Sequence, residues 1–228
     1  MTTVKLPCRW LDEAWGGKKT QDMLPIFTIS DKQIKITIFP NGAAGMRVVT
    51  RPIETPGNVT FKVPKALRAF VRLMVDFQDV SLLIEGTSLT ITGENCCSAV
   101  QYHFPIIELT DDNEIVPHPQ DVSITVPTSH WLSLWKTIPP KGEISMVYDK
   151  SKRSITLKHS KGRWGAAIQA REKPPRSGTF ICDAKVGKRV FSDCTPETPF
   201  SVLILMDCGV LKWKENQTTI YLAPMIEK

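Results

Sequence analysis

The sequence predicts an α+β fold with two similar domains, each made of two β-α-β-β-β units. The first observation is a repeated segment, because residues 58–63 and 121–126 both alternate apolar and polar side chains and then reach a proline. Such alternation is typical of a half-buried strand, and proline is tolerated in the first turn of a helix. The prolines, Pro64 and Pro127, lie 127 − 64 = 63 residues apart, and helical spacing follows each. The second observation is that three strand-like runs follow each helix, so the chain reads as a repeat.

Four such repeats follow one another along the chain. The first has a strand at 3–6, a helix at 9–15 and strands at 26–30, 33–39 and 47–50. The second has a strand at 58–63, a helix around 67–74 and strands at 80–84, 89–92 and 99–104. The third has a strand at 121–126, a helix around 131–135 and strands at 143–148, 154–157 and 164–169. The fourth has a strand at 179–182, a helix at 185–192 and strands at 200–206, 210–213 and 218–222.

The domain boundaries follow from this repeat. Two repeats form an N-terminal domain at 1–107, and two more form a C-terminal domain at 121–228. Residues 108–120 are the predicted connector, because Asp111-Asp112-Asn113-Glu114 with Pro117 and Pro119 has the composition of an exposed loop.

Composition indicates a globular protein with a polyanionic partner. Apolar residues make up 42% and charged residues 23% of the 228 positions, and no apolar run approaches the ~20 residues that span a bilayer. The N-terminus does not resemble a secretion signal, so we expect an intracellular protein. The net charge of +6 favours a nucleic acid or an anionic membrane surface as partner.

The residues that could carry chemistry form no recognisable site. The six cysteines contain no C-x-x-C pair, and the four histidines lack metal-ligand spacing. Phosphate-loop, nucleophile-elbow and dinucleotide motifs are absent from the sequence. We therefore expect no enzyme activity, no metal and no cofactor.

The positions of the positive charges are more informative than their total number, because many of the charges fall on the predicted helices or next to them. In the second helix three of them share one face, opposite the apolar side chains. Three of the four helices present basic residues with no acidic residue interleaved, which favours contact with a phosphate backbone over an ordinary solvated face. These basic residues are Arg9, Lys18 and Lys19, then Lys65, Arg68 and Arg72, and finally Lys185, Lys188 and Arg189; the third helix adds only Lys136.

The repeat and the C-terminal tail together resemble the DNA sliding clamp family, in its proliferating cell nuclear antigen-like form. The tail reads Thr219-Ile220-Tyr221-Leu222-Ala223-Pro224-Met225-Ile226-Glu227, and this family typically ends with a tyrosine-leucine-alanine-proline string and an isoleucine-glutamate pair. The order of elements extends the resemblance over nearly the whole chain.

The resemblance implies a processivity factor that encircles double-stranded DNA and tethers DNA polymerase and other replication proteins. Helices would line the inner face, sheets would lie outside, and the ten helix cations named above would contact DNA. The connector would cover a pocket for partner peptides, lined by Phe39, Ile115, Val116, Pro117, Tyr221, Ala223 and Pro224. A homotrimer would form by pairing of edge strands, with residues 99–106 and 164–170 as candidates, and an ATP-driven clamp loader would open the ring.

The sequence departs from the usual pattern of the sliding clamp family in two ways, and these leave alternatives to a cellular ring-shaped clamp open. The chain is basic throughout and short for a cellular clamp, which favours a viral or phage protein acting on replicating DNA in the host cytoplasm or nucleus. A non-ring viral factor that holds DNA electrostatically as a monomer or dimer is one alternative, and a checkpoint-type subunit of a heteromeric ring is another. A small enzyme with an unrecognised site is a distant third.

Overall fold

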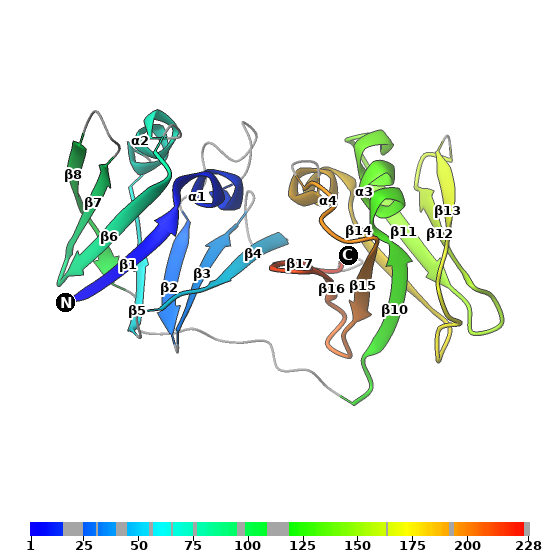
Figure 1. The fold of residues 1–228 in the computed structure, drawn as a ribbon. Helices are drawn as coiled ribbons and strands as arrows, with labels where there is room; N and C mark the ends of the chain where they lie inside the picture. The colour runs from blue at the N-terminus through cyan, green and yellow to red at the C-terminus, as the bar shows by residue number, and fades with distance from the viewer. Residues whose placement is uncertain are drawn as a thin grey trace. The chain divides into compact units, whose positions relative to one another are not determined.

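The computed structural model of the chain describes two compact domains (Figure 1). The described residues are 1–15, 25–30, 32–39, 45–54, 57–64, 66–74, 77–94, 99–108, 119–162, 164–191 and 194–225. Those from 1 to 39 and from 48 to 108 form the N-terminal domain, whereas 45–47 and 119–225 belong to the C-terminal domain. Most of the predicted connector lies outside the described residues.

The N-terminal domain contains the first two repeats and a short extra strand. The first repeat consists of β1 (Thr2–Pro7), α1 (Cys8–Trp15), β2 (Ile26–Ser30), β3 (Gln33–Ile38) and β4 (Gly45–Pro52). The second consists of β5 (Asn58–Lys62), α2 (Ala66–Leu73), β6 (Asp79–Glu85), β7 (Ser88–Glu94) and β8 (Ala99–Pro105), and β9 (Ile107–Glu108) follows. The β-α-β-β-β order predicted from the sequence is confirmed, whereas β9 was not predicted.

The C-terminal domain repeats this order. The third repeat consists of β10 (Val122–Pro127), α3 (Thr128–Thr137), β11 (Glu143–Tyr148), β12 (Ser154–His159) and β13 (Gly165–Gln169). The fourth consists of β14 (Gly178–Asp183), α4 (Ala184–Phe191), β15 (Phe200–Leu205), β16 (Leu211–Glu215) and β17 (Thr218–Leu222). The strand-to-helix junctions have local causes, since Pro127 keeps extended geometry before α3 and the Asp183 carboxylate accepts the Val186 N–H at 2.9 Å as an N-cap of α4.

The first strand of each repeat pairs with the neighbouring repeat rather than with its own. In the N-terminal domain β1 pairs antiparallel with β6, and β5 pairs with β2, giving the strand orders β1-β6-β7-β8 and β4-β3-β2-β5-β9. The C-terminal domain follows the same rule, because β10 pairs with β15 and β14 with β11, in the orders β10-β15-β16-β17 and β13-β12-β11-β14. Each repeat therefore needs its neighbour to complete both sheets, and the pair folds around one core.

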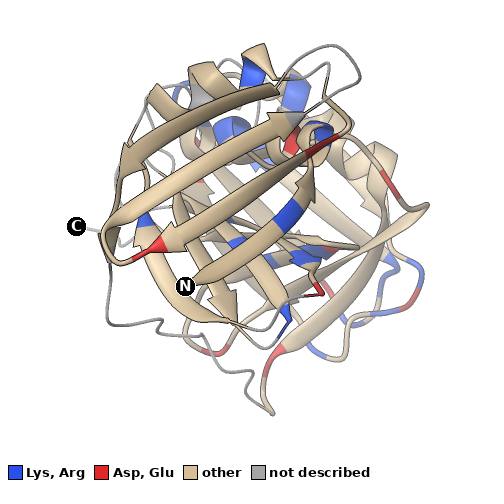
Figure 2. Ribbon diagram, turned by 60° about the vertical axis from the view of Figure 1, so that its left-hand side comes forward, with Lys and Arg blue, Asp and Glu red and all other residues tan. Residues whose placement is uncertain are grey.

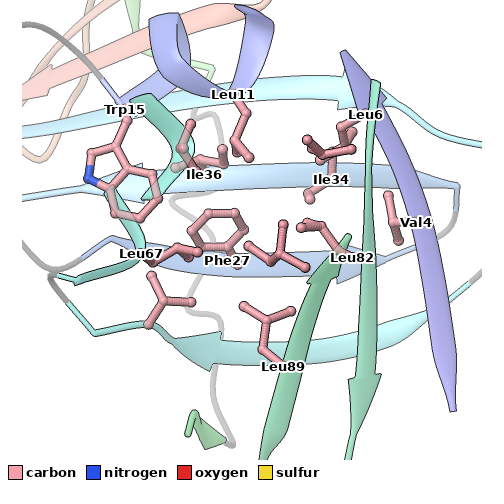
Figure 3. Packing of buried hydrophobic residues seen from close by; sticks show 14 of the residues in the cluster. Val4, Leu6, Leu11, Trp15, Phe27, Ile34, Ile36, Leu67, Leu82 and Leu89 are labelled. Atoms are coloured by element: carbon pink, nitrogen blue, oxygen red, sulfur yellow. The ribbon is translucent and has the colours of Figure 1, made fainter. Parts of the chain in front are cut away.

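The N-terminal core lies between the two sheets and beneath the helices. Figure 3 shows Leu11 and Trp15 of α1 above Phe27, Ile34 and Ile36, with side chains of the other sheet opposite. The Phe27 ring stacks on Phe61 with centroids 5.5 Å apart, which connects neighbouring strands β2 and β5. Burying such apolar side chains is the main favourable term in folding.

The C-terminal core is built on aromatic rings from both of its helices. Trp131 and Trp135 of α3 pack against Phe191 of α4, and Phe191 contacts Trp213 of β16 edge-on at 5.5 Å. Gly187 of α4 faces the Trp135 ring so closely that a Cβ there would lie 2.1 Å from Cζ3. The absence of a side chain at this position allows α3 and α4 to pack against each other.

Candidate functional site

In each domain the two helices lie side by side and present one face outward (Figure 1). Leu67, Phe70 and Val71 of α2 are buried, and so is Met74, the residue after this helix, as predicted for its apolar face. In α4 the buried residues are Ala184, Gly187, Val190 and Phe191, while Val186 is only partly buried. The helices are therefore amphipathic, and their remaining faces are available for contacts outside the core.

The described cations of α1 and α2 lie on these outward faces. Arg9 is exposed and Arg72 is half-buried. Lys18, Lys19 and Lys65 lie outside the described residues, as does the side chain of Arg68. In the N-terminal domain the structure thus describes the side chains of two of the six cations that were predicted to contact DNA.

The expectation that acidic residues are not interleaved among these cations is wrong for α1. The Arg9 guanidinium contacts the Glu13 carboxylate at 2.9 Å within the same helix, and Arg72 of α2 approaches Asp12 at 3.9 Å. The i,i+4 spacing of the first pair could have been read from the sequence. Because both pairs are exposed or half-exposed, their contribution to stability is small and they leave the arginines accessible.

In the C-terminal domain four predicted cations lie on the outward faces of α3 and α4. Lys136 and Lys185 are exposed, and Lys188 and Arg189 are half-buried. The Lys188 ammonium donates a hydrogen bond of 2.8 Å to the carbonyl of Ile138, the residue that ends α3. Lys188 therefore also ties α4 to the end of α3, a structural role that the sequence pattern did not reveal. Its positive charge at this helix end is favourable.

One sheet of the N-terminal domain, β1-β6-β7-β8, provides a contrast to the helix faces. Strands β1, β6, β7 and β8 together contain one lysine, Lys5, and no arginine, so this sheet is almost entirely free of blue in Figure 2. Lys5 is itself paired with Asp79 at 3.3 Å. This sheet offers almost no positive charge to a polyanion.

The predicted peptide pocket is described only in part. Phe39 follows β3 in the N-terminal domain and is 41% exposed, whereas Ile115, Val116 and Pro117 lie outside the described residues. The C-terminal members form a partly exposed apolar strip that runs from Tyr221 to Met225. The Lys212 ammonium lies 5.4 Å from the Tyr221 ring, and the Met225 N–H donates to the Ile181 carbonyl at 2.9 Å, so the strip is fixed to its own domain. The pocket itself stays a prediction.

Two strands end their sheets where the sequence suggested edges. β8 is the last strand of β1-β6-β7-β8, and β13 is the first of β13-β12-β11-β14. Tyr102 of β8 is 47% exposed, and its ring lies 4.0 Å from that of Phe70. An edge strand with free backbone groups is a template for pairing with another chain.

The described residues contain no arrangement typical of a metal centre. No group of three or more His, Cys, Asp and Glu side chains among them is placed to hold an ion. No helix in the same described ranges is both long and apolar enough to cross a membrane.

Comparison with known proteins identifies the fold. No protein-family model and no curated protein sequence matches the chain. Its structure is similar to that of the DNA polymerase III beta subunit of Thermotoga maritima, with a TM-score of 0.76 and 15% identity over 100% of this chain. A putative DNA polymerase III beta subunit from Eubacterium rectale gives a TM-score of 0.77 and 12% identity over 98% of this chain.

The match covers 65% of each of those two chains, so this chain spans slightly less than two thirds of their length. At these identities the similarity establishes the fold. The sliding-clamp fold expected from the four repeats is therefore confirmed, and activity and partners are taken up as proposals.

Proposed function

We propose that this protein is a DNA sliding clamp, a processivity factor that encircles double-stranded DNA and tethers a DNA polymerase without catalysing a reaction itself. The observation that supports this most strongly is the charge of the helix faces on a sliding-clamp fold. The six described helix cations are all exposed or half-exposed, while the apolar faces of the same helices are buried. Contacts between such cations and phosphates are independent of sequence, which is what sliding along DNA requires.

We further propose a closed homotrimer. β8 and β13 each lie at a sheet edge, so β8 of one copy can pair with β13 of the next. Because the two surfaces differ, the contact is heterologous and generates a ring when the rotation closes. Closure also removes both edges from solvent. Opening such a ring on DNA would need a clamp loader, and the Tyr221–Met225 strip with the connector would receive short apolar peptides from the polymerase.

Neutralising the helix faces tests the DNA contact. Replacing Arg72, Lys185 and Arg189 by alanine should lower clamp-dependent DNA synthesis and the salt dependence of DNA binding, by up to about 0.9 in log–log slope per lost duplex contact. The matched control replaces Lys158, Lys161 and Lys214, which are exposed and lie outside the helices. Unchanged synthesis in the helix variant, at unchanged oligomeric mass, would contradict the proposal.

The net charge of +6 favours one alternative within the same fold, a monomeric or dimeric factor that holds DNA electrostatically without a ring. This factor would bind DNA in the same salt-dependent way but would leave linear DNA and circular DNA at equal rates. A closed ring, once loaded, leaves linear DNA over its ends and is retained on a circle.

A further inference from the structure

A second concentration of positive charge lies away from the helices, on two loops of the C-terminal domain. The first loop is the β11–β12 turn, residues 149–153, and the second is the segment 171–177 that leads into β14. They contain six exposed cations against two carboxylates, Asp149 and Glu172. We call the six cations the basic patch: Lys150, Lys152, Arg153, Arg171, Lys173 and Arg176.

Hydrogen bonds hold the two loops together. The Lys150 N–H donates to Ser177 Oγ at 3.0 Å, and that hydroxyl donates to the Asp149 carboxylate at 3.3 Å. Asp149 also accepts the Ser151 N–H at 2.9 Å, which fixes the turn. The Ser151 hydroxyl also donates to this carboxylate at 2.9 Å, and the two bonds from Ser151 lower the pKa of Asp149.

Two further contacts extend the connection on either side of the loops. The Ala170 N–H donates to the Arg153 carbonyl at 2.7 Å, which places Arg171 next to the β11–β12 turn. Tyr148, at the end of β11, packs over Gly178 at the start of β14, where a Cβ would lie 2.2 Å from the Tyr148 hydroxyl. Burial raises the pKa of Tyr148, and the positive charge of Arg176 opposes this. The cations therefore stand on a preorganised backbone.

The cations of the patch form no salt bridge with other described residues. The salt bridges found among the described residues involve Lys5, Arg9 and Arg72, and none involves a member of the patch. The Arg171 guanidinium lies 5.3 Å from the ring of Phe200, which is 44% exposed. This cation–π contact occupies part of the neighbouring ring and leaves the arginine charge in place.

The β11–β12 turn of the patch and the start of α4 lie at opposite ends of β11. β11 begins at Glu143, next to the Gly142 carbonyl that accepts the Ala184 N–H at the start of α4, and ends at Tyr148 before the patch. Six strand residues at about 3.3 Å each separate these points by roughly 17–20 Å. The β11–β12 turn indeed lies at the end of β11 away from α3 (Figure 1). The β11–β12 turn, which carries Lys150, Lys152 and Arg153, thus lies on a surface distinct from the outward faces of α3 and α4.

We propose that the basic patch is a second nucleic-acid-binding surface, which contacts the phosphate backbone independently of the helix faces. Several unpaired, exposed cations on a rigid backbone suit a repeating anion, because each adds a phosphate contact and releases a counterion. An acidic peptide would need an apolar pocket for its anchoring side chains, whereas the apolar group described beside the patch is one exposed ring, that of Phe200, against which Arg171 already packs. The proposal depends on the fold of the C-terminal domain and does not require that the protein form a ring.

The test separates the patch from both the helix faces and the net charge. All variants are made in a background in which Lys136, Lys185 and Arg189 are replaced by glutamine, which removes three of the four described helix cations of the C-terminal domain. The patch variant adds Lys150→Gln, Lys152→Gln, Arg153→Gln and Arg176→Gln. The control variant adds Lys141→Gln, Lys158→Gln, Lys161→Gln and Lys214→Gln, four exposed positions in the same domain with the same loss of charge. Fluorescence anisotropy measures binding to a labelled 20-nucleotide single strand and to the matching duplex over a salt series.

The background protein should bind both probes, and the control variant should stay within a few-fold of it. The patch variant should bind at least tenfold more weakly at low salt. If all four cations contact phosphates, its log–log salt slope should fall by about 3.6 on the duplex or about 2.8 on the single strand. Equal affinities and slopes for the patch and control variants would overturn the proposal, as would equally effective competition by poly-glutamate of the same charge. The DNA-synthesis test of the helix variant bears on the proposed clamp function. Its outcome does not change how the binding measurements on the patch variant are interpreted.

Discussion

Replacing Gly187 by alanine should destabilise the C-terminal domain, although the same change in an exposed helix is stabilising. Alanine gains about 0.8–1.0 kcal/mol over glycine from helix propensity. Here, however, the new Cβ would lie 2.1 Å from Cζ3 and 2.5 Å from Cη2 of Trp135, whereas carbon atoms in contact normally stand about 3.5–4.0 Å apart.

The Trp135 ring has no free direction in which to move. It is stacked on Phe191 at 4.9 Å and meets Trp131 edge-on at 5.7 Å, and all three rings are buried. Overpacking of this kind costs about 1–3 kcal/mol, and the overlap at Gly187 belongs in the upper half of that range. After the gain in helix propensity is subtracted, Gly187→Ala should lower the free energy of unfolding by about 1–2 kcal/mol.

Urea unfolding followed by tryptophan fluorescence measures this change, because Trp131 and Trp135 report on the affected core. The control is Lys185→Ala, an exposed position two residues earlier in α4, which should change stability by less than about 0.5 kcal/mol. Combining Gly187→Ala with Trp135→Leu should cost less than the sum of the two single changes, because the leucine removes the clashing ring. A Gly187→Ala protein at least as stable as the original would refute this account of helix packing.

Two further predictions concern buried groups of the same domain. Ser201→Ala should cost about 1–3 kcal/mol, because the buried Trp213 indole N–H then loses its acceptor at 2.9 Å; thermal unfolding should show this, and an unchanged midpoint would contradict it. Iodoacetamide at pH 8 should alkylate Cys208, which is exposed, and leave Cys182 unmodified, because burial raises the pKa of Cys182 to about 12. Peptide mapping by mass spectrometry distinguishes the two thiols. Equal labelling of both in the folded protein would contradict this prediction.

Much of the fold could be predicted because its local signals are strong. Residues 26–30 were expected as a strand and form β2 with the same bounds, and the expected strand at 99–104 forms β8 with one more residue. Strands alternate with a period of two, and the proline before α3 marks the strand-to-helix switch. The two-residue strand β9 carries no such pattern, because it is defined only by its pairing with β5.

The exchange of first strands between repeats could not be read from the sequence. β1 is followed at once by α1, yet it pairs with β6, which begins 79 − 7 = 72 residues after β1 ends. This pairing is determined by the shape of the shared core, and the secondary-structure propensity of the local sequence carries no information about that shape. The helix cations were predictable as a class, since amphipathic spacing shows which positions face outward. The contact of Arg72 with Asp12 and the bond from Lys188 to Ile138 depend on helix packing and required the structure.

The mass of the protein in solution tests the proposed ring most directly. One chain has a mass of 25.6 kDa, so a trimer has 3 × 25.6 = 76.8 kDa. Sedimentation equilibrium at micromolar concentration, without DNA, should give the trimer mass, because the pairing of β8 with β13 does not involve DNA. A mass of 25.6 kDa under the same conditions would contradict the self-assembled ring.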